Sequence, residues 1–354
     1  MKKFFFFAAA MATTLCVNAE TINNHEYVDL GLPSGLRWAT TNVGATNPED
    51  YGDYYAWGEI ATNKSTYDWE NYTLANGSST TFTKYNNSSS NGTVDNKTTL
   101  EAADDAATQI WGGAWRMPTL EELDELERKC TWTWTTLNGV NGHEVKATNG
   151  NSIFLPAAGY CANDELLDAG SYGYYWSSSL NADDPYYAKN VRFDSDSYRT
   201  GNYRRDYGRS VRPVVMFYGI TIAAATNGTV EASKTVAAAG ETITLTITPE
   251  TGYEVESVIA INADTKIPLA VSEDYKFTMP AANVSVSATF KATTATALQN
   301  VEMAEIYAEN GTIYGAEVMQ IFTITGQNVT EMNGQLNGVY IVKCAEKAQK
   351  IIVR

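Results

Sequence analysis

The chain has 354 residues, with 41 acidic against 25 basic side chains and a formal net charge of −16. Nucleic acids and anionic membranes are bound through basic surfaces, so this charge excludes both as general partners. The length corresponds to two or three domains, each large enough to bury its own core.

The chain begins with the pattern of an export signal. Lys2 and Lys3 precede an apolar run over residues 4–15, and Val17-Asn18-Ala19 supplies a small-x-small cleavage pattern. We therefore predict a signal peptide at residues 1–19 and a mature protein that is secreted or on the outer cell surface, with the periplasm as the alternative. The apolar run is shorter than the roughly 20 residues that span a bilayer, so no transmembrane segment is expected.

The cysteines limit the covalent chemistry. Cys16 follows a leucine where a lipoprotein signal requires a small residue, so lipid attachment is not expected. Cys130, Cys161 and Cys344 then remain in an oxidising compartment, and an odd number allows at most one intrachain disulfide. Whether Cys130 and Cys161 are bonded stays open.

Changes in composition along the chain predict the domain boundaries. Residues 20–216 are rich in Trp, Tyr, Gly and Asn and hold all 8 tryptophans. Residues 217–291 show strict apolar-polar alternation, as in Glu241–Pro249, which predicts half-buried strands. Residues 292–300 have little capacity for a core and indicate a linker. Residues 301–354 then contain three short apolar runs separated by Gly- and Asn-bearing turns, which predict a β-rich domain.

The first of these regions contains a predicted loop and a predicted helix. Asn, Ser, Thr and Gly dominate residues 63–99, which indicates a long polar insertion. The helix follows Thr119, whose side chain is expected to cap the first turn together with Glu122, and its leucines recur every third residue. Four tryptophans beside Gly and Pro are expected to fill a core: Trp38, Trp57, Trp115 and Trp176.

Five motifs in this region occur in one order: Tyr27–Thr40, Tyr55–Glu59, Trp115–Thr119, Gly173–Ser179 and Gly208–Pro213. Together they resemble the Fibrobacter succinogenes major paralogous domain family, which belongs with the formylglycine-generating enzyme and the C-type-lectin-like folds. The resemblance implies an α+β N-terminal domain of C-type-lectin-like/formylglycine-generating-enzyme-like type, followed by two small all-β modules.

The resemblance brings no catalytic residue to this chain. The formylglycine-generating enzyme uses a reactive cysteine pair near its C-terminal end, whereas Cys130 follows the predicted helix and Cys161 lies in Ala-Gly-Tyr-Cys-Ala. The calcium-binding strings of lectins are absent, and so are phosphate-binding glycine loops. With His25 and His143 as the only histidines, a three-histidine metal site is excluded, and we expect both at the surface. We predict no enzyme activity, no metal and no cofactor.

One stretch is locally basic despite the acidic chain. Between Lys189 and Pro213, seven Lys and Arg side chains alternate with tyrosines and face three aspartates. Tyrosine rings stack on sugars, and arginines hold carboxylates or sulfates by paired hydrogen bonds. The alternative is that the arginines pair with the aspartates and the tyrosines fill a core. The ligand-binding hypothesis names Tyr198, Tyr203, Arg204, Arg205 and Tyr207.

Two further resemblances concern the C-terminal half. Motifs within residues 218–291 resemble a divergent internalin B-repeat-like bacterial repeat: Gly228-Thr-Val, Ala239–Leu245, Gly252–Val255 and Tyr275–Pro280. That resemblance implies a small β-grasp-like spacer or adhesive module. The last motifs look like the C-terminal sorting domain of type IX secretion cargo: Gly326–Val329, Leu336–Lys343 and Lys350–Arg354.

These features together favour an exported surface or secreted, non-catalytic binding protein. Its expected partners are a glycan or protein ligand at the cell surface, and the export machinery, including type IX secretion. One alternative is a structural or fimbria-associated surface component. Another is a formylglycine-generating-like or glycan-active enzyme, for which the scarcity of histidine and the missing cysteine pair are unfavourable.

Overall fold

The computed structural model describes residues 20–62, 64–293, 306–315, 319–344 and 347–354. The predicted signal peptide lies outside these residues, as does most of the predicted linker. The chain forms two compact units, one up to Thr293 and one from Thr294 onward.

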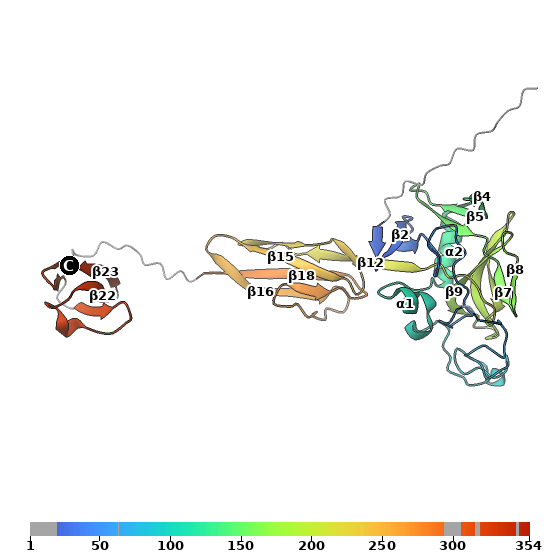
Figure 1. Ribbon diagram of the computed structural model, residues 1–354, viewed down its shortest axis with the longest axis horizontal. Coiled ribbons are helices and arrows are strands. Elements are labelled where there is room, and N and C mark those ends of the chain that lie inside the picture. The colour runs from blue at the N-terminus through green and yellow to red at the C-terminus, as the bar shows by residue number, and fades with distance from the viewer. Residues whose placement is uncertain (1–19, 63, 294–305, 316–318, 345–346) are drawn as a thin grey trace, which may run out of the picture. The chain divides into compact units, whose positions relative to one another are not determined.

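The N-terminal part of the first unit consists of short strands and short helices (Figure 1). In chain order these are β1 (Glu20–Ile22), β2 (His25–Asp29), β3 (Leu36–Ala39), the 3-10 turns η1 (Ser89–Asn91) and η2 (Ala102–Asp104), α1 (Ala106–Trp111), α2 (Leu120–Lys129), β4 (Thr131–Leu137), β5 (Val140–Lys146), β6 (Ser152–Pro156), β7 (Tyr160–Ala162), β8 (Glu165–Leu167), β9 (Gly173–Leu180), β10 (Tyr187–Phe193) and β11 (Tyr198–Arg204). They form the separate sheets β4–β5–β6, β7–β8 and β11–β10–β9, while β1, β2 and β3 belong to a larger sheet.

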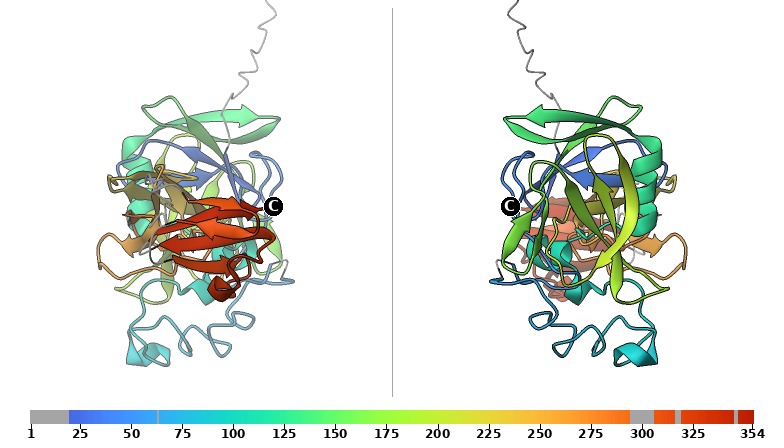
Figure 2. Two further views of the ribbon diagram at one scale, coloured as in Figure 1. Left: turned by 90° about the vertical axis from the view of Figure 1, so that its left-hand side faces the viewer. Right: turned by 90° about the vertical axis from the view of Figure 1, so that its right-hand side faces the viewer.

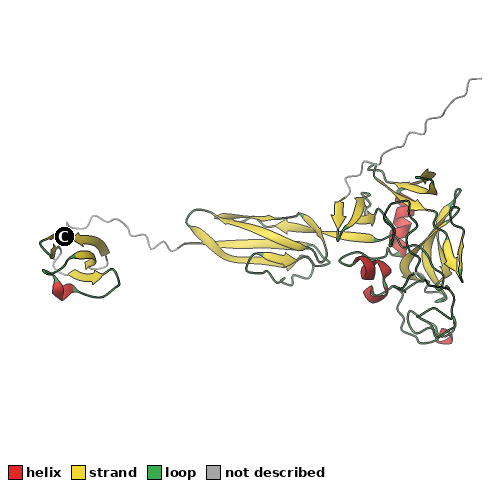
Figure 3. Ribbon diagram, viewed as in Figure 1, coloured by secondary structure: helices red, strands yellow, loops and turns green. Residues whose placement is uncertain are grey.

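The α+β fold predicted for the N-terminal domain is wrong. Of the described residues, 45% are in strands and 8% in helices, and the strands form several small sheets, so the fold is mostly all-β. Figure 3 shows how little of the first unit is helical. The physical reason is that the Trp-, Tyr- and Gly-rich segments around α2 carry no helical period, and they form short strands and turns instead.

The helix α2 confirms the prediction made from its capping pattern. The hydroxyl of Thr119 accepts the backbone N–H of Glu122, and the Glu122 carboxylate accepts the backbone N–H of Thr119 at 2.8 Å. Leu123 and Leu126 are buried, so one face of the helix packs on the core. Among the described residues, no helix combines the length and apolar character needed to span a bilayer.

Large aromatic side chains fill two clusters in this part of the unit. One cluster contains Trp57, Trp115 and Trp176, and the other contains Trp38. None of the four is more than 1% exposed. The prediction that these tryptophans form the core is therefore confirmed, and none of them is available to a ligand.

Strand β12 (Val214–Ile222) belongs both to the N-terminal region and to the region that follows it. At its start Val214 pairs with Trp38 of β3, and at its end Ile220 pairs in parallel with Val284 of β18 (Val284–Ala292). Between them, the ring of Phe217 lies 5.1 Å from that of Tyr27. The domain boundary predicted between residues 216 and 217 thus falls inside one strand (Figure 1).

The remainder of the first unit is a small all-β region. Its elements are β13 (Gly228–Ala232), β14 (Val236–Ala238), β15 (Thr242–Pro249), β16 (Tyr253–Asn262), β17 (Lys276–Thr278) and β18. The alternation in β15 and β18 buries Ile243, Leu245, Val284 and Val286 in one core, which confirms the strands predicted from that pattern.

The second unit contains the three strands predicted near the C-terminus. They are β21 (Met319–Thr323), β22 (Gly338–Cys344) and β23 (Lys347–Val353), hydrogen-bonded in that order. The unit also has a β19 (Tyr307–Glu309) and β20 (Thr312–Tyr314) hairpin and the turn η3 (Thr330–Met332). This hairpin is too short to give a periodic signal in the sequence.

The expectation that both histidines lie at the surface is wrong for His143. It is 3% exposed on β5, and its Nε2 lies 2.8 Å from the carbonyl oxygen of Asp194. The rings of Trp132 and Phe193 lie 5.6 and 5.1 Å from its own ring. Desolvation lowers the pKa of His143 below its usual 6.5, so the neutral imidazole is the form that fits this site.

The buried His143 predicts an acid-sensitive fold. Because its pKa is lower when folded than when unfolded, the unfolded chain binds the proton more tightly, and stability falls as pH drops below about 6.5. We expect the variant His143→Phe to lose less stability than the parent between pH 7 and 5. Urea denaturation at both pH values measures this, and an equal loss in the two proteins would contradict the assignment.

Candidate functional site

Residues 64–99 of the predicted insertion form an ordered loop with its own small apolar cluster. Tyr67, Tyr72, Ala75 and Phe82 are buried together, although the segment contains no strand and only the turn η1 among its described residues. The loop and the β4–β5 hairpin lie at opposite ends of the N-terminal part (Figures 1 and 2). The apolar cluster therefore stabilises the conformation of an insertion whose composition is mostly polar.

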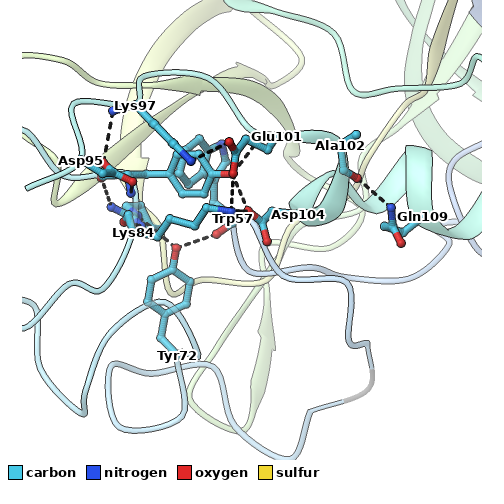
Figure 4. A network of polar contacts seen from close by, with 11 residues as sticks. Trp57, Tyr72, Lys84, Asp95, Lys97, Glu101, Ala102, Asp104 and Gln109 are labelled. Atoms are coloured by element: carbon cyan, nitrogen blue, oxygen red, sulfur yellow. Dashed lines mark hydrogen bonds and ion pairs between the residues drawn. The ribbon is translucent and has the colours of Figure 1, made fainter. Parts of the chain in front are cut away.

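A network of charged side chains fixes this loop to the turn η2 (Figure 4). The Lys84 ammonium contacts the carboxylates of Asp104 and Glu101, the latter at 2.6 Å, and Lys97 reaches the same Glu101 at 2.6 Å. Asp95 accepts backbone N–H groups of the loop itself, from Tyr85 among others. Every charge in this network has a partner from the chain, so its role is to anchor the loop.

Arg205 is the second anchor of this loop. It is also one of the five residues that the sequence predicts to bind a ligand. Its side chain is fully buried, and its guanidinium donates to the hydroxyl of Tyr72 at 3.0 Å and to the carbonyl oxygens of Tyr85 and Pro185 at 2.9 and 3.0 Å. It also lies 4.4 Å from the centre of the Phe82 ring. Its N–H groups donate to buried acceptors, so Arg205 anchors the loop and cannot contact a ligand at the surface.

Arg204, its neighbour in the chain, is half-buried and lies among a different set of aromatic rings. Its guanidinium is 4.5 Å from the ring centre of Tyr207, 5.6 Å from that of Trp69 and 5.8 Å from that of Tyr186. Asp206 clamps the guanidinium with hydrogen bonds of 3.0 and 2.6 Å. Because the Asp206 carboxylate is itself fully buried, this pair orients Arg204 rigidly.

The aromatic surface continues beyond Tyr207. The ring of Tyr160 stacks on that of Tyr207 at 5.5 Å, and the indole of Trp69 lies 4.9 Å from the ring of Tyr186. All four aromatic side chains are half-buried, so each keeps part of its ring accessible. We call the set the aromatic platform: Trp69, Tyr160, Tyr186, Arg204 and Tyr207.

The two remaining predicted residues lie apart from the platform. Tyr203 stands on β11, where its ring covers the guanidinium of Arg209 at 4.2 Å. Tyr198 stacks on Trp132 at 4.8 Å and packs against the core on the other side of the sheet. Of the five predicted residues, the structure therefore brings Arg204 and Tyr207 together, puts Tyr203 on a neighbouring surface, and places Arg205 and Tyr198 in packing roles.

The described residues offer no obvious alternative chemistry at this surface. They contain no group of three His, Cys, Asp or Glu side chains that could hold a metal ion. The Asp194 carboxylate accepts the backbone N–H groups of Asp196 and Ser197 in its own turn. Cys130 and Cys161 are both free thiols, and burial raises the pKa of each to about 11, which disfavours the reactive thiolate.

Sequence reasoning missed the contributions of Trp69 and Tyr160. Both are distant in sequence from the basic stretch that carries Arg204 and Tyr207, and they meet it only through the fold. One signal was available for Trp69, which is the only tryptophan within the polar insertion. A large aromatic residue in a loop of Asn, Ser and Thr needs either a core or a ligand to explain it.

Two family models match parts of the chain. Residues 218–294 match the divergent InlB B-repeat domain, which supports the repeat resemblance, and such a bacterial repeat is an indication of a surface or extracellular protein. Residues 134–214 match a domain of unknown function, DUF8237. Neither match concerns the formylglycine-generating-enzyme-like family or a sorting domain, so these two resemblances stay predictions. No curated protein and no solved structure matches the chain.

Proposed function

We propose that this is an exported, non-catalytic binding protein that recognises a carbohydrate through its aromatic platform. The observation that carries the proposal is the set of four half-buried rings around one rigidly clamped arginine. Sugar rings stack their C–H faces on aromatic side chains, and a fixed guanidinium beside those rings donates hydrogen bonds to sugar hydroxyls. Rigid aromatic groups also lose little side-chain entropy when a ligand binds.

The geometry favours an extended ligand over a single small one. Trp69 comes from the insertion, Tyr160 from β7, Tyr186 from the loop before β10, and Tyr207 from the turn after β11. The platform therefore crosses four separate segments. The anchors already described, Arg205 and the Lys84 network, hold the insertion in register with the other three. A surface assembled in this way offers several stacking positions in a row, which suits consecutive sugar units.

A glycan array probed with the full chain tests the proposal, with the strongest binder then measured by calorimetry. We expect Trp69→Ala and Tyr207→Ala each to weaken binding about tenfold or more, because removing one stacking ring costs on the order of 1–2 kcal/mol. Binding is expected to persist in EDTA, since the platform uses rings and a guanidinium.

The matched control is Tyr307→Ala, which removes an exposed tyrosine of the second unit and should leave binding unchanged. Far-UV circular dichroism and thermal melting show whether each variant is folded. The proposal would be contradicted if no glycan on the array binds. It would also be contradicted if folded Trp69→Ala and Tyr207→Ala variants both bind as tightly as the parent.

The proposed location follows from the two ends of the chain. Residues 1–19 would direct export, and the tail from residue 301 would direct the protein to the outer surface by type IX secretion. Fractionation of cells expressing the chain with and without residues 301–354 tests the second part. A surface location independent of that tail would contradict it.

A further inference from the structure

The three buried arginines of the N-terminal part do not have equivalent surroundings. Arg205, Arg209 and Arg212 are each at most 1% exposed. Arg212 donates to the side chain of Asn42 at 2.9 Å and to the Phe154 carbonyl at 2.9 Å, among other acceptors. Arg205 is satisfied in the same way, by a hydroxyl and by carbonyl oxygens. The N–H donors of these two cations are thus satisfied by uncharged acceptors of the chain itself.

Arg209 lacks such a set of acceptors. Its Nε is buried without a hydrogen-bond partner, and no carboxylate among the described residues forms an ion pair with it. With the Asn190 amide oriented to satisfy both of its groups, the Asn190 oxygen accepts one bond from the Arg209 guanidinium. The remaining contacts of the guanidinium are with aromatic rings, and the ring centres of Tyr203 and Trp176 lie 4.2 and 4.6 Å from its Cζ. A buried cation without an anion is costly even when rings offset part of the cost.

Two more arginines lie on the same face of the β9–β10–β11 sheet. Arg192 of β10 pairs in register with Arg199 of β11 on one side and with Tyr174 of β9 on the other, so the three side chains share one face. Arg192 and Arg209 both lie over the ring of Tyr174, at 6.0 and 4.7 Å. Like charges directly opposite each other destabilise a sheet unless an anion lies near them.

Of these three cations, only Arg192 has a carboxylate partner among the described residues, and the nearby Asp168 accepts from the Tyr174 hydroxyl at 3.0 Å. Asp194 approaches Arg192 only to 3.8 Å, and the Nε of Arg192 is a second buried donor without a partner. Arg199 is exposed, and no described carboxylate forms an ion pair with it. Arg192 and Arg199 reach solvent, whereas Arg209 supplies positive charge from beneath the tyrosines, where the low dielectric strengthens its field.

We propose that this arginine face, formed by Arg192, Arg199 and Arg209, binds an oxyanion of the ligand, so that the carbohydrate recognised by the platform is an acidic one. The inference rests on the proposed function, because Tyr203 and Tyr160 lie over Arg209 and join this face to the platform. The oxyanion is a carboxylate of a uronic acid or a sulfate ester. Either would pair with the solvent-facing N–H groups of Arg192 and Arg199.

The test is an array on which each acidic oligosaccharide is printed beside its carboxyl-reduced or desulfated counterpart, probed with the full chain. We expect acidic members to bind about tenfold more tightly than their neutral counterparts and to lose affinity between 50 and 300 mM salt. Weaker binding after carboxyl reduction identifies a uronic acid as the source of the oxyanion. Weaker binding after desulfation identifies a sulfate ester.

Substitutions locate the oxyanion. We expect Arg199→Gln and Arg192→Gln each to reduce the preference for the acidic member several-fold, while Arg128→Gln, an exposed arginine of α2, leaves it unchanged. Arg199 is exposed, so its variant tests the site without disturbing the core. Equal binding of acidic and neutral members would overturn this inference and leave the proposed function standing. Binding of neither class would contradict both.

Discussion

Replacing Arg205 with methionine is expected to lower the free energy of unfolding by at least about 3 kcal/mol, because it leaves buried acceptors unpaired at about 1–3 kcal/mol each. The Tyr85 and Pro185 carbonyls and the Tyr72 hydroxyl would lose their donor, and Arg205 itself is 0% exposed. Urea denaturation measures the loss. Limited proteolysis should also cut the insertion at residues 63–99 faster, since Arg205 anchors it.

Two control substitutions separate this role from a general effect of removing arginine. Arg128→Met, at an exposed position of α2, should change stability by less than about 0.5 kcal/mol. Arg205→Lys should be nearly as damaging as Arg205→Met, because an ammonium cannot reach acceptors on both sides of a planar guanidinium. An Arg205→Met protein as stable as the parent would show that the insertion is held without this residue.

Ending the chain after Pro213 is expected to abolish cooperative folding of the N-terminal part. Strand β12 supplies Val214 and Val215, both fully buried, to the two cores of that part, and each contributes on the order of 2 kcal/mol by burial. The truncation also removes one of the two strand partners of β3, which then keeps only β2. A chain of residues 20–293 keeps β12 and its partners β3, β14 and β18, and it is expected to melt cooperatively.

Thermal melting of the two fragments, followed by near-UV circular dichroism, gives the comparison. The near-UV signal reports the environment of the buried tryptophans, all of which lie before residue 214. A fragment of residues 20–213 that melts cooperatively at the temperature of the longer one would contradict the shared role of β12. Such a result would also support the domain boundary between residues 216 and 217 that composition predicts.

Local sequence signals predicted local structure well. The Thr119 and Glu122 capping pattern placed the start of α2, and alternation placed β15 and β18, because both signals depend on neighbours within one element. The fold class of the N-terminal domain was predicted from a resemblance and was wrong. No pattern in its Trp- and Gly-rich segments specified how many short strands they form or how those strands pair.

The candidate site was only half predictable for the same reason. The density of Arg and Tyr between Lys189 and Pro213 marked the correct region, yet it could not distinguish Arg204 from Arg205. Adjacent residues at the end of a strand point in opposite directions, so one faces the platform and the other the interior. Trp69 joins Arg204 across more than a hundred residues, and such a contact leaves no trace in local sequence.

The most direct test of carbohydrate recognition is fluorine NMR of the full chain labelled with 5-fluorotryptophan, titrated with the strongest array binder. Trp69→Phe assigns the resonance of the platform tryptophan. We predict that this resonance shifts on titration, while those of the buried Trp38 and Trp57 do not. An unmoved Trp69 resonance under saturating ligand, or a shift confined to other tryptophans, would contradict the assignment of the platform as the binding surface.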